Sequence, residues 1–315
     1  DLGISVTTDS TKVSDFLSSN NNKLKVIITT YQSGNVIIES TNQLNYEFDL
    51  GIFDEAHKTT GDKNKKFAQL LNDNLLDIKK KIFMTATERQ FVGNSDNIIS
   101  MDNEEIYGKI INQLSFKKAL TQDPPILCDY KVITNFVTKK EIEQLIVTNS
   151  LTRANGKNYT FVEDSTTIAA LIAHIKLTKE RNIKNTISFH KNIKRAKDFA
   201  ELYEQLNAVD SYSRNISAYH VNGKMGTSDR NTLIENFKNS SPSLISNARC
   251  LTEGVDIPVV DAVIFADPKQ SVIDIVQASG RAMRTHPNKK LGYIIIPVIV
   301  DNESPDVTND SFKQL

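Results

Sequence analysis

The chain has 315 residues, of which 39% are hydrophobic and 24% are charged, as is typical of a soluble globular protein. This length is enough for two domains of roughly 100 to 200 residues each. The 38 basic and 38 acidic residues balance, which excludes the strongly basic surface of many nucleic-acid-binding proteins, so any contact with nucleic acid must come from local clusters.

No stretch of the sequence is apolar enough to suggest a membrane protein. A transmembrane helix needs roughly 18 apolar residues in a row, whereas the longest apolar run, residues 293–300, is short and contains Pro297. Cys128 and Cys250 are isolated and lack metal-type spacing, which favours small buried side chains in a reducing compartment over a disulfide framework. We therefore expect a cytoplasmic protein.

Three short apolar runs in the first third of the chain are typical of buried strands. They span residues 24–29, 48–53 and 80–85, and each ends at polar residues. Such runs alternate with turns and amphipathic stretches along the chain, which indicates an α/β fold with a parallel sheet covered by helices. Ligands of these sheets bind beyond the carboxyl ends of the strands, so functional side chains are expected there.

The sequence Asp-Glu-Ala-His at residues 54–57 directly follows the second apolar run. One carboxylate at a strand end can bind Mg²⁺ while a second orients a water molecule, and phosphoanhydride hydrolysis requires both. Asp54 and Glu55 stand in the right order for these two roles. The four residues alone leave a solvated acidic turn open as the alternative.

The sequence Met-Thr-Ala-Thr at residues 84–87 follows the third apolar run. The hydroxyl groups of Thr85 and Thr87 could hydrogen-bond the acidic segment and transmit its state. Threonine is also common in strands for reasons of packing alone. The two segments together favour a functional site more strongly than either does separately.

A loop at residues 121–125 with two consecutive prolines marks the expected domain boundary. The first domain then comprises residues 1–122, the second residues 123–300, and a polar tail follows at 301–315. The strands expected in the second domain span residues 129–136, 186–190, 216–221, 243–247, 261–266 and 292–297. Apolar residues at helical spacing predict helices over residues 193–206 and around residues 233–237.

A basic run follows the expected strand at residues 186–190. Its members are Lys191, Lys194, Arg195 and Lys197. These side chains could contact the phosphates of a nucleic acid, or they could form an ordinary solvated helix face. His174 lies in an apolar stretch and is interpreted as a packing residue without chemistry. No histidine shows the spacing of a zinc site.

Two segments near the end of the second domain combine glycine with charged residues. Residues 251–258 place Gly254 among acidic and hydroxyl side chains, which suits a loop that contacts nucleotide and phosphate but also an ordinary turn. In residues 277–284, Arg281 and Arg284 are three apart and would share one helix face, from which they could reach a transferring phosphoryl group. A cationic helix end that complements the helix dipole is the alternative.

Taken in order, these segments resemble the motifs of superfamily 2 helicases. The segments similar to motifs Ib, II, III, V and VI are residues 30–33 (Thr-Tyr-Gln-Ser), 54–57, 84–87, 252–256 and 277–284. Residues 187–190 resemble motif IV, and residues 219–223 resemble the next strand, which contacts nucleic acid. The resemblance covers nearly the whole chain. It implies two tandem RecA-like parallel-sheet domains and an ATP-dependent motor that uses Mg²⁺.

The resemblance implies roles for residues of the first domain. Asp54 would coordinate the Mg²⁺ of ATP, Glu55 would polarise the attacking water, and His57 would couple the site to the second domain. Thr85 and Thr87 would link hydrolysis to movement along a strand.

The resemblance assigns the second domain to nucleotide and nucleic acid. Gly254 and Asp256 would lie near the sugar and phosphates of the nucleotide. The residues expected to reach the γ-phosphate are Gln277, Arg281 and Arg284. The residues expected along the nucleic acid are Thr30, Gln32 and Ser33 from the first domain with Lys191, Asn222 and Thr252 from the second.

A finer resemblance concerns residues 54–61 and 247–297, which are similar to the helicase part of single-chain, type I-like restriction-modification enzymes and related phage-defence helicases. It implies an ATP-dependent DNA helicase or double-stranded DNA translocase, with DNA favoured over RNA as the partner. An RNA helicase and a non-catalytic nucleic-acid-binding module are the alternatives. The second alternative is disfavoured by the presence of Glu55, Gln277, Arg281 and Arg284.

One motif of the family is missing. The phosphate-binding sequence GxxxxGK[ST] occurs nowhere, and the three Gly-Lys pairs begin at Gly108, Gly156 and Gly223 with no hydroxyl residue after the lysine. In the family this loop lies well before the acidic motif, whereas here Asp54 is close to the start. We therefore expect a first domain truncated at its amino terminus, and we expect the 315 residues alone to be inactive.

Overall fold

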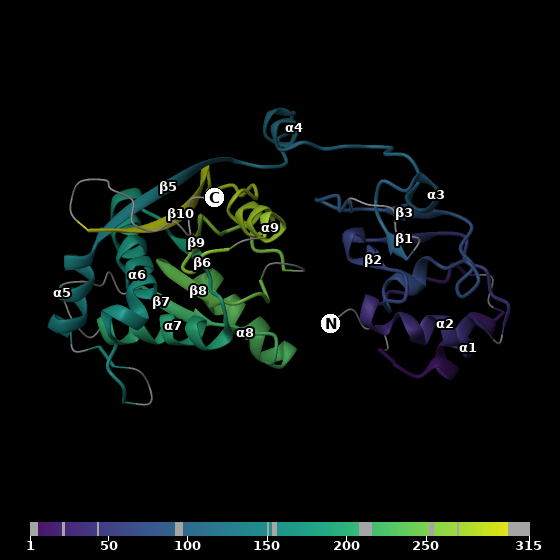
Figure 1. Ribbon diagram of the computed structural model, residues 1–315, viewed down its shortest axis with the longest axis horizontal. Coiled ribbons are helices and arrows are strands. Elements are labelled where there is room, and N and C mark those ends of the chain that lie inside the picture. Colours follow the sequence, from purple (N-terminus) through teal and green to yellow (C-terminus); the bar gives the residue numbers. More distant parts are fainter. Residues whose placement is uncertain are drawn as a thin grey trace. The chain divides into compact units, whose positions relative to one another are not determined.

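The structure is a computed structural model whose contacts divide the chain into two compact units, residues 1–113 (unit 1) and 114–315 (unit 2) (Figure 1). The residues it describes are 6–20, 23–42, 44–91, 97–149, 151–152, 156–207, 216–251, 255–269 and 271–301. The division falls after Gln113, while the sequence places it after Gln122, and the domain limits drawn from the sequence stay predictions. Within the described ranges, no helix is both long and apolar enough to span a bilayer.

Unit 2 is built on a six-stranded sheet in the order β5-β10-β9-β6-β8-β7, in which every pair of neighbours is parallel. The strands are β5 (Asp129–Thr138), β6 (Asn185–Phe189), β7 (Ser217–His220), β8 (Ser243–Asn247), β9 (Ala262–Phe265) and β10 (Leu291–Val300). The helices are α4 (Phe116–Thr121), α5 (Lys139–Asn149), α6 (Phe161–Arg181), α7 (Ile193–Asn207), α8 (Thr227–Asn239) and α9 (Val272–Ala282). All six expected strands and both expected helices are confirmed to within a few residues, and so is the α/β class.

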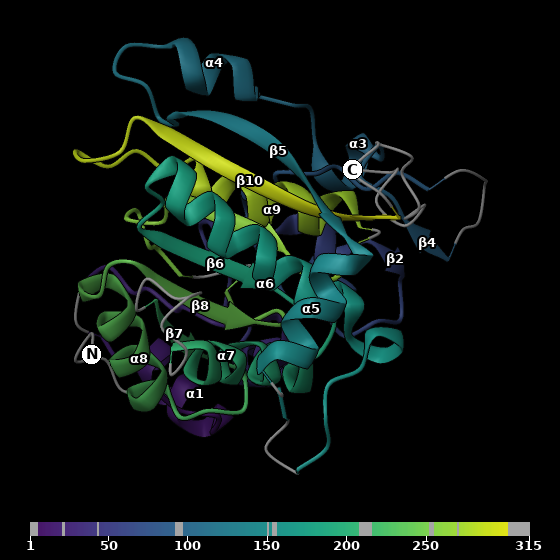
Figure 2. The same cartoon turned by 90° about the vertical axis from the view of Figure 1, so that its left-hand side faces the viewer.

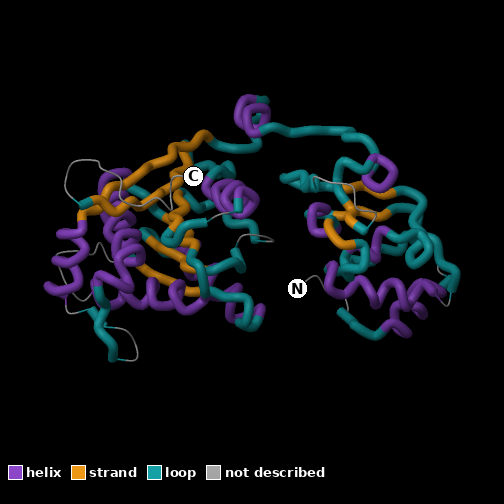
Figure 3. The backbone as a smooth tube through the Cα atoms, in the orientation of Figure 1, coloured by secondary structure: helices purple, strands orange, loops and turns teal. Residues whose placement is uncertain are grey.

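Helices cover both faces of this sheet. Successive strand residues point to opposite faces, so Ile264 packs with α5, α6 and α7 on one side, and Val263 packs with α8 and α9 on the other. Figure 2 shows α5 and α6 in front of the strands, and Figure 3 shows the orange strands of the sheet among purple helices. The sheet interior is therefore fully shielded from water along its central strands.

The strand β10 shows how local sequence fits this sheet. It pairs with β5 over its whole length, but with β9 only from Tyr293 to Ile295. Pro297, which has no N–H to donate, therefore lies beyond the part that has strands on both sides. A Cβ atom at Gly292 would lie 2.2 Å from the carbonyl oxygen of Ala282, so glycine is required where α9 ends against β10.

Three residues of unit 2 without a motif have defined environments. His174 is fully buried, with Nδ1 2.6 Å from Tyr203 Oη and Nε2 2.9 Å from Thr186 Oγ1, and its burial lowers its pKa to about 3. The packing role expected for it is confirmed. Cys128 and Cys250 are both free, and they are half-buried rather than buried as expected.

Unit 1 is smaller and has little sheet. Its helical segments are α1 (Ser10–Ser18), η1 (Tyr31–Ser33), α2 (Gly34–Asn42), η2 (Ala56–Thr59), η3 (Ala68–Leu71) and α3 (Glu104–Tyr107). Its strands are β1 (Gly51–Phe53), β2 (Gly61–Asp62), β3 (Lys81–Phe83) and β4 (Ile98–Ile99). The parallel pair β1 and β3 aligns Gly51 with Lys81 and Phe53 with Phe83, so two of the three runs expected in this region do contain strands.

Only one face of the β1 and β3 pair is covered. Phe53 packs with Ile37, Ile38 and Leu70 in the core of unit 1. On the opposite face, Ile52 is 60% exposed and Ile82 is 37% exposed. The expectation that both runs are buried strands is therefore wrong for this face.

The segment at residues 24–29 is a further correction. It forms no strand, although its sequence is typical of one, and Leu24 and Ile28 are 90% and 80% exposed. The alternation of apolar residues survives in part, because Ile27 packs against the core of unit 1 while its neighbours do not. A strand exists only where another strand supplies its hydrogen bonds, which a single run of sequence does not reveal.

Candidate functional site

The acidic loop begins where β1 ends. Asp54 is exposed, and its Oδ1 accepts a hydrogen bond of 2.9 Å from the backbone N–H of Glu55. Glu55 has a left-handed backbone with φ 50° and ψ 45°, a conformation that costs a residue with a side chain about 1–2 kcal/mol. The next residue, Ala56, is fully buried and donates its N–H to the carbonyl of Met84 at 2.9 Å. The chain therefore turns sharply at Glu55 and is anchored on both sides of it.

His57 connects the acidic loop to the segment that follows β3. Its Nδ1 lies 3.0 Å from Thr85 Oγ1 and 3.4 Å from Glu55 Oε2. Thr85 Oγ1 donates its own proton to the carbonyl of Thr87 at 2.9 Å, so we assign the donor in the first contact to Nδ1 of His57. The expected contact between the two segments is present, through Thr85.

Two tyrosines to which the resemblance assigns no role also hold this loop. Thr59 Oγ1 donates to the carbonyl of Ala56 at 2.7 Å, so Tyr107 Oη is the donor in its 2.8 Å contact with Thr59 Oγ1. Tyr31 Oη donates to the carbonyl of Asp54 at 2.6 Å. Burial and the nearby Asp54 carboxylate raise the pKa of Tyr31 to about 12. Residues far apart in sequence make these contacts, so spacing alone could not reveal them.

The turn at residues 30–33 carries the expected nucleic-acid residues of unit 1. Thr30 and Gln32 are exposed, and Ser33 is half-buried. Ser33 N–H donates to the carbonyl of Thr30 at 3.0 Å, and Thr30 Oγ1 donates to Ser33 Oγ at 3.3 Å. The turn is thus closed on itself and presents two polar side chains to solvent.

In unit 2 the two arginines meet the loop before β9. Arg281, which is 9% exposed, donates from Nη1 to the carbonyl of Val255. Arg284 forms an ion pair with Asp256, and burial lowers the pKa of its guanidinium. Sequence reasoning placed both arginines on one helix face, but α9 ends at Ala282, so Arg284 lies beyond the helix. They converge through the loop rather than through helical spacing.

The structure describes only some of the other residues expected to contact the nucleotide. Gln277 lies on α9 and is half-buried. Gly254 and Thr252 fall outside the described residues. Gly280, in the same segment, has open space where a Cβ atom would be.

The carboxyl ends of the parallel strands carry the expected nucleic-acid residues of unit 2. Lys191 follows β6 and is exposed. Asn222 follows β7, and its Oδ1 accepts the N–H of Lys224 at 2.9 Å. Because β6 and β7 flank β8 in the sheet, these residues lie at the same edge, where the fold allows ligand binding.

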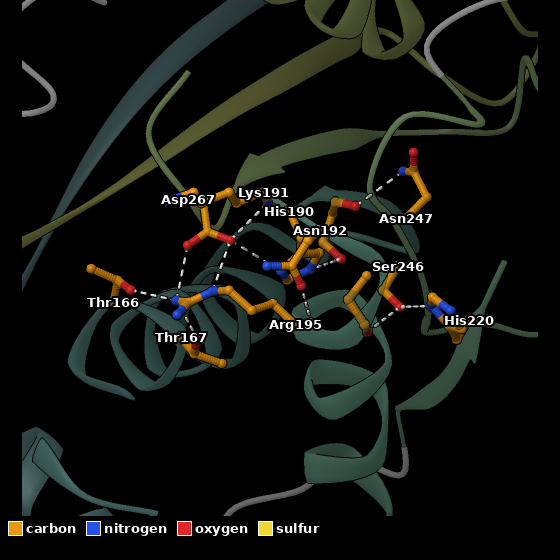
Figure 4. Close-up of polar contacts among 12 residues, drawn as sticks. Thr166, Thr167, His190, Lys191, Asn192, Arg195, His220, Ser246, Asn247 and Asp267 are labelled. Atoms are coloured by element: carbon orange, nitrogen blue, oxygen red, sulfur yellow. Dashed lines mark hydrogen bonds and ion pairs between the residues drawn. The ribbon is translucent and has the colours of Figure 1, made fainter. Parts of the chain in front are cut away.

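Arg195, expected in the same basic run, is not free to bind phosphate. Its guanidinium contacts both carboxylate oxygens of Asp267, from Nη2 to Oδ1 at 2.8 Å and from Nε to Oδ2 at 3.1 Å. The same Nη2 lies 2.7 Å from the hydroxyls of Thr166 and Thr167 on α6 (Figure 4). Lys191 adds its backbone N–H to Asp267 Oδ2 at 2.9 Å. The sequence offered two roles for the basic run, a solvated helix face or contact with phosphates. Neither describes Arg195, whose guanidinium is held within the fold.

His190 lies beneath this cluster. Its side chain is fully buried and its Nδ1 is 3.9 Å from Asp267 Oδ2, while Nε2 lies 2.9 Å from Ser188 Oγ. Burial, followed by the charge of Arg195, lowers its pKa to about 3. The signal that sequence reasoning missed is positional, because Asp267 and Arg195 follow the adjacent strands β9 and β6.

The side chains at the end of β1 can be compared with those that bind Mg²⁺ together with a nucleotide. Among the residues for which the structure gives positions, no three side chains of His, Cys, Asp or Glu cluster as metal ligands. One exposed carboxylate, Asp54, stands beside Glu55 at the end of β1. Mg²⁺ is usually bound through one or two carboxylates together with substrate phosphates, and this donor set fits that mode.

Two family models match the chain. Residues 4–90 match the model described as "Type III restriction enzyme, res subunit", and residues 166–286 match "Helicase conserved C-terminal domain". The first match contains the acidic loop and the segment after β3, and the second contains Arg281 and Arg284. A probable helicase of African swine fever virus is 26% identical over 298 residues, which is 92% of this chain and 30% of that protein.

Solved structures extend the likeness. The ATP-dependent Type ISP restriction-modification enzyme LlaBIII, bound to DNA, is similar over 100% of this chain and 23% of its own, with 29% identity and a TM-score of 0.77. A nuclease-deletion mutant of the Type ISP enzyme LlaGI, in complex with a DNA substrate mimic, is 28% identical over 94% of this chain and 19% of its own, with a TM-score of 0.56. The chain thus spans less than a third of the length of these relatives, and its fold resembles tandem RecA-like domains.

Proposed function

Because the chain belongs to superfamily 2 of the helicases, we propose that it is the motor part of an ATP-dependent DNA helicase or double-stranded DNA translocase. The protein that contains it is a restriction-modification or related defence enzyme that acts in the cytoplasm. Members of the family use ATP, typically with Mg²⁺. The proposal extends the family assignment to a substrate, a biological role and individual residues.

The acidic loop is the single observation that carries the proposal. Glu55 is held in a strained left-handed backbone while its carboxylate approaches His57. Strain of this kind is kept where surrounding contacts over-determine it, often at sites of chemistry. We assign Glu55 to orienting the water that attacks the γ-phosphate, Asp54 to holding Mg²⁺, and His57 with Thr85 and Thr87 to transmitting the state of the site.

The arginines supply positive charge to the same reaction. When bound, the metal and its nucleotide provide the phosphoryl group and neutralise part of its charge. Arg284 is the more accessible of the two arginines, because its side chain is 34% exposed whereas Arg281 is 9% exposed. Gln277, Arg281 and the loop at residues 252–256 complete the proposed nucleotide set, with Gly254 and Asp256 beside the sugar.

DNA is proposed as the nucleic acid on the strength of the relatives. Both solved structures with 28–29% identity were determined with DNA or a DNA mimic. Thr30, Gln32, Ser33, Lys191, Asn222 and Thr252 are assigned to its backbone. Contacts of this type position a strand without reading its sequence.

The decisive experiment measures ATP hydrolysis by the full-length protein with duplex DNA, with single-stranded RNA, and with no nucleic acid. We expect stimulation by DNA and a loss of roughly 10²-fold or more in the stimulated rate for Glu55→Gln, which removes the carboxylate that orients the attacking water. Glu47→Gln is the matched control, because Glu47 is a half-exposed partner of Lys79 on the same unit.

The outcomes separate the candidate functions. Stimulation by RNA alone would make the protein an RNA helicase. Absence of stimulation by either would leave a non-catalytic binding module and refute the motor. The 315 residues by themselves are expected to show no hydrolysis, because they contain no GxxxxGK[ST] sequence.

A further inference from the structure

Tyr31 connects two parts of the proposed motor that are distant in sequence. Its ring packs against the core of unit 1 and lies 5.5 Å from the ring of Phe67. Its hydroxyl reaches the carbonyl of Asp54 at 2.6 Å, across a separation of 23 residues. The side chain belongs to the turn at residues 30–33, but its polar end belongs to the acidic loop.

The atom that Tyr31 contacts determines the backbone of Glu55. The carbonyl oxygen of Asp54 lies in the plane of the peptide bond that joins Asp54 to Glu55. Rotation of that plane changes ψ of Asp54 and φ of Glu55 together. A hydrogen bond that fixes this oxygen therefore helps to hold Glu55 at φ 50°, and the direction of its side chain follows from that angle.

The other end of the connection is stiff. The turn at residues 30–33 is closed by Ser33 N–H on the carbonyl of Thr30 at 3.0 Å. Directly after it, Gly34 packs so closely that a Cβ atom would lie 2.8 Å from the side chain of Leu70. A displacement of Thr30 or Gln32 is thus passed to the ring of Tyr31 rather than absorbed by the backbone.

We propose that Tyr31 is a positioning residue that couples the turn at residues 30–33 to Glu55, so that nucleic acid bound at the turn sets the orientation of the carboxylate. This inference rests on the proposed function.

Tyr31→Phe removes the hydroxyl and keeps the ring. In the full-length protein we expect the ratio of DNA-stimulated to unstimulated hydrolysis to fall about 3- to 10-fold, since a single neutral hydrogen bond is lost. The fall should appear in kcat and leave KM for ATP within about twofold. A role in general stability would not produce this split.

Tyr107→Phe is the matched control. Tyr107 also donates a hydroxyl to the acidic loop, but it does so from α3 and to Thr59 rather than to the carbonyl of Asp54. We expect the stimulation ratio of this variant to stay within about twofold of the unmodified protein. Equal losses in the two variants would overturn the coupling and indicate loosening of the loop in general.

Amide hydrogen exchange on the 315-residue chain gives a readout that does not depend on activity. We expect exchange at residues 55–58 to be about threefold or more faster in Tyr31→Phe than in Tyr107→Phe. Unchanged exchange together with an unchanged ratio would refute the role of Tyr31, while loss of hydrolysis in Glu55→Gln would still uphold the motor. If no nucleic acid stimulates the unmodified protein, the proposed function fails and the coupling fails with it.

Discussion

The two units differ in how their sheets are shielded from water. In unit 2, the residues of β9 alternate between two helical layers, so that Val263 and Ile264 are both fully buried on opposite faces. In unit 1, Phe53 on β1 is buried while its neighbour Ile52 is 60% exposed. Parallel sheets are normally covered on both faces. The contrast shows that similar apolar runs can have very different burial within one chain.

The largest effect expected from this contrast concerns matched isoleucines. Ile264→Ala in unit 2 should lower the free energy of unfolding by about 2–5 kcal/mol, because it leaves a cavity in a closed core. Ile52→Ala in unit 1 should lower it by less than about 1 kcal/mol, because that side chain is 60% exposed. Urea unfolding followed by hydrogen exchange, which reports each unit separately, measures both. Equal losses would mean that the exposed face of unit 1 is shielded in solution.

The next largest effect concerns how acid changes the stability of each unit. His174 and His190 in unit 2 each have a pKa lowered to about 3 by burial, whereas an unfolded histidine titrates near 6.5. The unfolded state binds more protons below pH 6.5, so stability is lost as pH falls from there towards 3. Between pH 7 and pH 5, each of the two histidines should lower the free energy of unfolding by on the order of 2 kcal/mol.

The histidine prediction is checked by following the unfolding midpoint of each unit against pH. His57 is the single histidine of unit 1, so we expect a smaller loss there over the same interval. His174→Gln removes one titrating group and should flatten the profile of unit 2 by less than half, because burial also lowers the pKa of His190 and of His220. A profile that is unchanged by this substitution would contradict the assignment of the loss to buried histidines.

The smallest of these effects concerns the ion pair at the edge of the unit 2 sheet. Arg195→Met removes the guanidinium that joins α6, α7 and Asp267, and the side chain of Arg195 is 25% exposed. We expect the free energy of unfolding of unit 2 to fall by about 1–2 kcal/mol. This is less than for a fully buried ion pair, because solvent screens the charges. Lys197→Met, on an exposed position of the same helix, should change the stability by less than about 0.5 kcal/mol.

Sequence reasoning was most successful where local pattern and tertiary context agree. The strands of unit 2 follow from apolar runs because each run has neighbours that pair with it, and the helix at residues 193–206 follows from its apolar stripe. The acidic loop was located correctly because its residues are contiguous. Residues 24–29 were predicted wrongly because pairing partners are not encoded in the run itself.

The parts of the site that sequence could not supply depend on contacts across the fold. Tyr31 and Tyr107 hold the acidic loop from 23 and 48 residues away. Tyr31 lies in the segment similar to motif Ib, but neither its type nor its spacing indicates this contact. Arg195 looked like one basic residue among four until its contacts with Asp267 were seen. The sequence also did not reveal that α9 ends before Arg284, because the length of a helix depends on how its last turn packs.

The left-handed backbone of Glu55 has a consequence for how this position can evolve. Glycine adopts that conformation without steric penalty, so a change from Glu55 to glycine would relieve about 1 kcal/mol of strain while it deletes the carboxylate. Selection for a more stable fold would therefore pull this position away from glutamate, and the proposed role of the carboxylate in hydrolysis would hold it there. In a lineage that does not need the proposed activity, we expect this residue to be among the first to drift.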